Sequence, residues 1–147
     1  MKAEELLEAL SKRECAVECI TEALQYKNDW VVRYSGINHA SATTDHIATA
    51  LQDPIWHIRS MAIRHRNVSG NHIATALTDT VAVVRIVAAR SPNATTENIT
   101  YALHDEHRGV RRSAILNPNV APCHIAIALQ DSCWVIKQAA EKIVLDN

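Results

Sequence analysis

Histidine, a residue type that can bind metals, recurs at a fixed spacing in this sequence. His46, His72 and His124 lie at multiples of 26 residues, and Asn98 occupies the same place in the remaining copy. Equivalent residues on neighbouring packed helices lie about 10 Å apart, whereas a zinc–nitrogen bond is only about 2 Å long. We therefore expect these side chains to serve at helix starts and in hydrogen bonds between repeats, and we predict no metal site.

Four cysteines are the other potential metal ligands: Cys15, Cys19, Cys123 and Cys133. Cys15 and Cys19 are four residues apart and would share one face of a helix. A closed zinc site needs about four ligands, and no nearby histidine or cysteine completes a standard spacing. We expect free thiols that are buried by ordinary packing, and we predict no cofactor.

Basic residues also recur every 26 residues, as a phosphate-binding ladder would: Arg33, Arg59, Arg85, Arg111 and Lys137. Each of the last four follows an aspartate by six residues: Asp53, Asp79, Asp105 and Asp131. This pattern favours ion pairs that link neighbouring repeats over a site for phosphates. If partly exposed, each pair adds only about 0–1 kcal/mol of stability.

Motifs of catalysis and of membrane insertion are absent from the sequence. It contains no glycine-rich phosphate loop, no nucleophile elbow and no His-Glu-x-x-His motif, so we predict that the protein is not an enzyme. The formal net charge is -1, which argues against general affinity for nucleic acids or membranes. The acidic start of the chain is unlike a signal peptide, and we expect a cytoplasmic protein without a membrane partner.

The elements that must position these residues come from a 26-residue repeat. The segment His46–Asp53 recurs at 72–79, 98–105 and 124–131. Apolar spacing predicts two helices per repeat, a short one such as 70–78 and a longer one such as 54–65. A small residue recurs within each longer helix and should let a neighbouring backbone come close: Gly36, Ala62, Ala88, Ala114 and Ala140.

A repeat of this length cannot bury its apolar faces alone, so we expect a single all-α domain over residues 1–147, an α-solenoid of about five stacked repeats. The repeats would span 19–45, 46–71, 72–97, 98–123 and 124–147. Residues 1–18 would form an N-terminal cap with a helix at 3–10. Ser11 and Glu14 match a capping box, which predicts that a second helix starts near Lys12 and ends near Gln25.

The repeat resembles a known family at two stretches. Leu77-Thr78-Asp79 followed by residues 84–95, and Leu103-His104-Asp105 followed by residues 110–119, are similar to the leucine-rich repeat variant. The Asp…Val-Arg…Ala pattern is also similar to the wider HEAT-like group. The resemblance covers residues 19–140, and it implies a right-handed superhelix of short helices that serves as an interaction surface.

Recognition should use positions where the copies differ, and these lie on the longer helix. One variable row holds Tyr34, Ser60, Ile86, Arg112 and Gln138, and a second, four residues on, holds Asn38, Arg64, Arg90, Leu116 and Lys142. A third row holds Trp30, Trp56, Ala82, Arg108 and Trp134, whose tryptophans we expect to pack between repeats rather than to be exposed anchors. The partner-binding candidates are Tyr34, Arg64, Ile86, Arg90, Arg108 and Arg112.

The leading hypothesis is a scaffold that binds another protein through this variable strip. The alternative is a HEAT-like protein that binds nucleic acid, because Arg64, Arg90 and Arg112 stand near Arg66 and Arg108 in a basic region. A third hypothesis is end-to-end self-association through apolar residues at 143–145, and the oligomeric state stays open.

Overall fold

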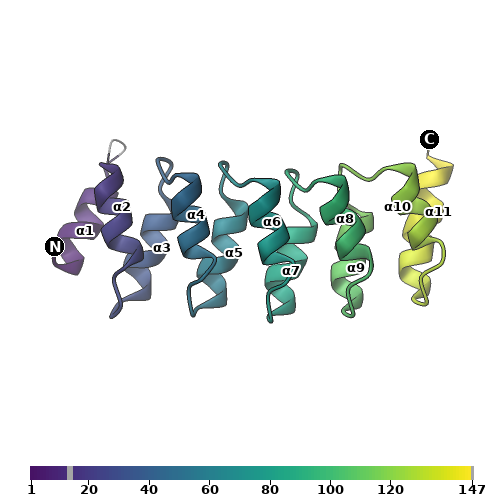
Figure 1. Cartoon of the computed structure of the whole chain (residues 1–147), viewed down its shortest axis with the longest axis horizontal. Coiled ribbons are helices and arrows are strands. Elements are labelled where there is room, and N and C mark those ends of the chain that lie inside the picture. Colours follow the sequence, from purple (N-terminus) through teal and green to yellow (C-terminus); the bar gives the residue numbers. More distant parts are fainter. Residues whose placement is uncertain (13–14, 147) are drawn as a thin grey trace. The chain divides into compact units, whose positions relative to one another are not determined.

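The computed structural model describes residues 1–12 and 15–146, and in this part of the chain it contains α-helices and no β-strands (Figure 1). The predicted all-α class is confirmed. The helices are α1 (Ala3–Leu10), α2 (Val17–Leu24), α3 (Trp30–Asn38), α4 (Thr44–Ala50), α5 (Trp56–Arg64), α6 (Gly70–Ala76), α7 (Ala82–Ala89), α8 (Thr96–Leu103), α9 (Arg108–Ile115), α10 (Pro122–Ala128) and α11 (Trp134–Leu145).

The chain divides into two compact units, Met1–His72 and Ile73–Asn147, with the boundary inside α6. In the first unit α3 packs against α1, α2 and α5. Leu6, Ile20, Ile47 and Ile58 are fully buried, as their apolar spacing predicts. A Cβ atom on Gly36 would lie 3.0 Å from the Cβ of Ala23, so the small residue does allow α2 and α3 to approach closely.

The start of the second helix was predicted wrongly. α2 begins at Val17, not near Lys12, and Cys15 and Ala16 precede it. Ser11 instead ends α1: its amide donates to the carbonyl of Leu7 (3.0 Å) and its hydroxyl donates to the carbonyl of Glu8 (2.6 Å). Glu14, the other member of the expected capping box, lies outside the described residues.

The second unit repeats one packing arrangement. α9 packs against α7, α8 and α11, and α10 packs against α11. Its core consists of branched aliphatic residues interleaved with alanines. Ala88, Ala114 and Ala140 are fully buried, which confirms the predicted small positions of the longer helices. Among the described residues, no helix is both long enough and apolar enough to cross a membrane.

Candidate functional site

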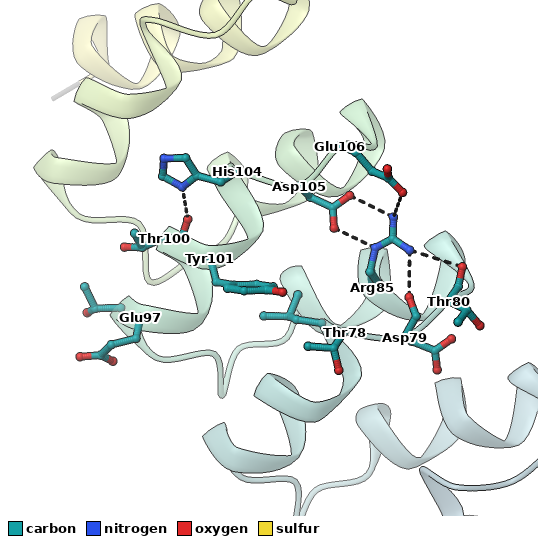
Figure 2. Close-up of a pocket in the computed structure, with 12 residues that line it drawn as sticks. Thr78, Asp79, Thr80, Arg85, Glu97, Thr100, Tyr101, His104, Asp105 and Glu106 are labelled. Atoms are coloured by element: carbon teal, nitrogen blue, oxygen red, sulfur yellow. Dashed lines mark hydrogen bonds and ion pairs between the residues drawn. The ribbon is translucent and has the colours of Figure 1, made fainter.

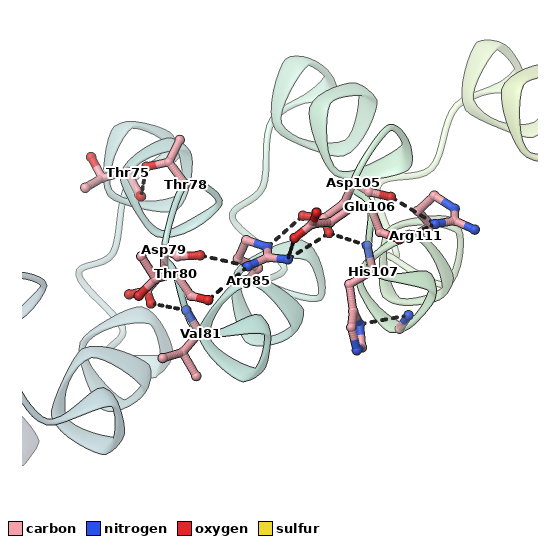
Figure 3. Close-up of polar contacts among 11 residues, drawn as sticks. Thr75, Thr78, Asp79, Thr80, Val81, Arg85, Asp105, Glu106, His107 and Arg111 are labelled. Carbon is pink, nitrogen blue, oxygen red and sulfur yellow. Dashed lines mark hydrogen bonds and ion pairs between the residues drawn. The ribbon is translucent and has the colours of Figure 1, made fainter.

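The recurrent arginines form ion pairs and hydrogen bonds within the fold. Arg85 donates from Nε to Oδ2 of Asp105 (2.8 Å) and from Nη2 to Oδ1 (3.1 Å; Figure 3), and Arg111 makes the same two bonds to Asp131 (2.7 and 3.1 Å). In the first unit, Arg33 pairs in this way with Asp53. The predicted links between neighbouring repeats are confirmed within each unit.

These ion pairs are more buried than a surface bridge. The side chains of Arg85 and Asp105 are 10% and 6% exposed. The third donor of Arg85, Nη1, reaches the carbonyl of Asp79 at 2.9 Å. The hydrogen bond from Arg111 is the main cause that lowers the pKa of Asp131, which keeps this carboxylate charged. With further bonds from Nη1 to Thr80 and from Nη2 to Glu106, all five N–H groups of Arg85 have acceptors within the fold, which leaves none for a phosphate.

The recurrent histidines are helix caps. The amide of Thr43 donates to Nδ1 of His46 (3.1 Å), and the amide of Ala121 donates to Nδ1 of His124 (2.9 Å). Asn98 supplies an amide oxygen in the same role. Because Nδ1 accepts, the ring hydrogen lies on Nε2, which contacts the previous repeat at Thr21 Oγ1 in the case of His46 (2.9 Å). The predicted role at helix starts is confirmed.

A large hollow lies within the second unit, on the side of the short helices (Figure 2). It is a groove of about 1010 Å³, which we call the acidic groove. Tyr101 of α8 stands in it with 57% of its surface exposed. The lining residues come from the loop after α6, from α7, from α8 and from the loop after α8: Leu77, Thr78, Asp79, Thr80, Arg85, Thr96, Glu97, Thr100, Tyr101, His104, Asp105 and Glu106.

Negative charge dominates the acidic groove. Four carboxylates line it against the single guanidinium of Arg85. Glu106 is 90% exposed at its side chain and only reaches Arg85 at 3.5 Å. Hydrogen bonds, first from its own backbone and then from the Thr95 side chain, lower the pKa of Glu97, which therefore stays ionised. The groove thus combines an exposed aromatic ring with more carboxylates than guanidinium groups.

Our sequence reasoning missed this groove because it placed variability on the longer helices. The short helix also varies: Tyr101 stands where three other copies have Thr49, Thr75 and Ile127. Likewise, Glu106 replaces Pro54, Thr80 and Ser132. An aromatic and an acid that are special to one copy were visible in the sequence, and comparing the short helices position by position would have found them.

The predicted partner-binding residues lie largely at the surface. Arg64 in the first unit is exposed, as are Arg90, Arg108 and Arg112 in the second. Tyr34 and Ile86 are half-buried. One member of the first variable row, Ser60, is buried, with only 5% of its surface exposed, so this row is not a continuous surface feature of the first unit.

The structure brings the two variable rows together at one place in the second unit. Arg112 and Gln138 of the first row and Leu116 and Lys142 of the second line a hollow of about 760 Å³ between α9 and α11. The helix spacing of four residues explains this, because such residues share a face. The end of α11 beside it is apolar and open, with Leu145 84% exposed.

The expectation that the tryptophans pack between repeats is wrong. Trp30, Trp56 and Trp134 are 50%, 36% and 69% exposed. Trp30 meets the ring of Tyr34 edge-on, with centroids 6.3 Å apart, and Trp56 stacks on His57 at 3.9 Å. Each tryptophan is the first residue of its longer helix. Its side chain therefore lies at the end of the helix and not among the core residues.

The thiols form no disulfide in the described residues. Cys15 is buried, and burial, followed by the neighbouring Cys19 thiol, raises its pKa, which makes it a poorer nucleophile at neutral pH. In residues 1–12 and 15–146 no group of three or more histidine, cysteine, aspartate or glutamate side chains is placed to hold a metal ion.

Comparison with known proteins returned no matching family model, no matching curated protein and no matching solved structure. The resemblance to the leucine-rich repeat variant and to HEAT-like repeats therefore stays a prediction.

Proposed function

We propose that this chain is a non-enzymatic, cytoplasmic α-solenoid of the leucine-rich repeat variant or HEAT-like type, and that it binds a protein partner. The variable strip on the longer helices is the proposed contact, with Arg64, Arg90, Arg108 and Arg112 as its charged members. Tyr34 in the first unit and Ile86 in the second would contribute apolar area. Arginine and aromatic residues are enriched at the energetic centres of protein interfaces.

One observation carries the proposal: the repeats divide their arginines into two classes. Arg85 and Arg111 recur in register, are bound by aspartates and serve the fold. Arg90 and Arg112 occur at positions where the copies differ, and they are exposed. Fold stability does not require a cation at these variable places, because other copies have Asn38, Leu116 or Ile86 there.

Quantitative affinity capture tests the proposal. Wild-type chain and the R90A/R112A variant are used as bait, with Lys27→Ala as a control that removes an exposed cation outside the strip. We expect a partner whose dissociation constant, measured afterwards with purified proteins, rises at least about tenfold in the double variant, since interface arginines often contribute 1 kcal/mol or more each. A complete absence of partners that depend on Arg90 or Arg112 contradicts the proposal.

Nucleic-acid binding is the second candidate function. The observation in its favour is that Arg64, Arg66, Arg90, Arg108 and Arg112 are all exposed, although Arg66 also donates to the carbonyl of Ala40 at 2.7 Å. Binding of this kind falls steeply with salt. A gel-shift experiment with labelled duplex and single-stranded DNA at low salt decides it, and the absence of any shift with either probe ends this alternative.

A further inference from the structure

We propose that the acidic groove binds an extended segment of a partner protein that contains arginine, with a guanidinium group lying over the ring of Tyr101. The inference deepens the proposed function and rests on it in one respect, namely that the chain binds proteins. It uses a different surface, formed by the short helix α8 and the loops on either side, and not the variable strip of the longer helices.

The exposed ring of Tyr101 is the first feature that points to a ligand. Its ring is 57% exposed in the middle of the groove (Figure 2). Among the described residues, its ring makes no aromatic contact and its hydroxyl makes no hydrogen bond. The core side of α8 is formed by Ile99, Ala102 and Leu103. Three other copies have threonine or isoleucine in this place, and the first has Glu22. The fold therefore does not need the aromatic side chain, and its face is available to a ligand.

The charge around the ring selects the ligand. Glu97 and Tyr101 are four residues apart on α8 and so share a face of that helix. Figure 2 shows Glu97 on one side of Tyr101, and Asp105 and Glu106 near Arg85 on the other. Even without Asp79, three carboxylates face one guanidinium, which Asp105 already binds. A cation that enters the groove meets an aromatic face and excess negative charge, the two features that attract an arginine side chain.

The shape of the hollow selects an extended segment. Its volume of about 1010 Å³ is at the upper end of small-molecule pockets, but it is an open groove that borders on loops. Leu77 and the methyl groups of Thr78 and Thr80 supply apolar walls between the acidic ends. A peptide backbone can lie along such a trough while one arginine fills its centre.

A titration of the isotopically labelled whole chain with a fluorescein-labelled peptide tests the proposal. The peptide alternates arginine with glycine and serine, and its control carries glutamate in place of arginine. Amide chemical shifts in NMR locate the contact, and fluorescence anisotropy gives the affinity. Four variants are compared: Tyr101→Phe, Tyr101→Leu, Glu106→Gln and Asp45→Asn, the last being a matched control because Asp45 is the first-unit equivalent of Glu97.

We expect the arginine peptide to shift amides around Tyr101 and Glu106, with affinity that weakens as salt is raised. Tyr101→Leu keeps the apolar bulk and the helix propensity but lacks the aromatic face, and it should weaken binding about two- to fivefold. Glu106→Gln should also weaken it, whereas Tyr101→Phe and Asp45→Asn should leave it unchanged. Circular dichroism of each variant verifies that the helices remain formed.

Three results overturn the inference: equal binding of the glutamate peptide, unchanged affinity of Tyr101→Leu, or shifts centred on another surface. If these results appear while capture still depends on Arg90 and Arg112, the acidic groove is excluded and the proposed function stands. If the peptide binds as expected but no partner depends on Arg90 or Arg112, the variable strip is excluded and binding belongs to the groove.

Discussion

Removing the charge of Asp105 is the most direct perturbation of the fold. Asp105 accepts two hydrogen bonds from Arg85 and one from the amide of His107 (2.8 Å). Asp105→Asn keeps the size of the side chain and an oxygen for the His107 amide, but it leaves a buried guanidinium without its carboxylate. We expect this substitution to destabilise the second unit much more than a surface substitution does.

The magnitude follows from what remains around Arg85. Breaking a buried ion pair from one side typically costs 3–5 kcal/mol. Here Glu106 lies 3.5 Å from Nη2, and the carbonyl of Asp79 still accepts from Nη1, so part of the loss is offset. We therefore expect a decrease of about 2–3 kcal/mol in the free energy of unfolding, at or just below the lower limit of that range.

Urea unfolding followed by circular dichroism measures the decrease, and native-state hydrogen exchange locates it among the amides of α7, α8 and α9. Glu8→Gln is the control, because the pair of Glu8 with Lys12 is 3.7 Å long and has side chains 76% and 69% exposed. The double variant R85M/D105N should cost about 1–2 kcal/mol less than the two single costs added together. Additive single costs, or a loss under about 0.5 kcal/mol for Asp105→Asn, would refute the reasoning.

Four further outcomes follow from the same structure. Burial lowers the folded-state pKa of His46. The neutral ring therefore stabilises the fold above about pH 6.5, and this stabilisation is lost as the pH falls below that value. His46→Asn should make the urea midpoint depend less on pH across this window. The folded-state pKa of Asp131 is also lowered, so its contribution is present above about pH 3.9 and disappears on further acidification, and acid titration of Arg111→Met should show a smaller change. Ile136→Ala, at a position with 0% exposure, should cost about 2–5 kcal/mol. Trp134→Ala, at 69% exposure, should change the thermal midpoint little.

The features that were predicted correctly are those that recur in several copies of the repeat. A buried Ile47, Ile73 or Ile99 at a constant spacing identifies the core side of a short helix, and each copy strengthens the same inference. The aspartate–arginine pairs were predictable for the same reason. Features that occur in only one copy were less predictable. Ser11 was expected to cap the start of α2, but its hydroxyl forms a hydrogen bond at the end of α1.

The candidate site was predicted less well than the fold. The exposed arginines of the variable strip follow from helix spacing, but the acidic groove depends on how loops after α6 and α8 surround Tyr101. Loop paths are not encoded in apolar periodicity. The tryptophans were misplaced because aromatic residues are usually buried, and only the structure shows that Trp30 and Trp134 begin their helices beyond the core.

The ion pairs of the second unit have a constant offset of 20 residues, from Arg85 to Asp105 and from Arg111 to Asp131. A deletion of residues 86–111 would place Asp131 at the distance along the chain that Asp105 now has from Arg85. A length change between a paired arginine and its aspartate that is not a whole repeat would leave a buried guanidinium facing the wrong residue, whereas the one extra residue of the first copy precedes Arg33 and leaves its pair with Asp53 intact. A whole-repeat change in length would therefore keep the pairing pattern, because it adds or removes one arginine together with one aspartate.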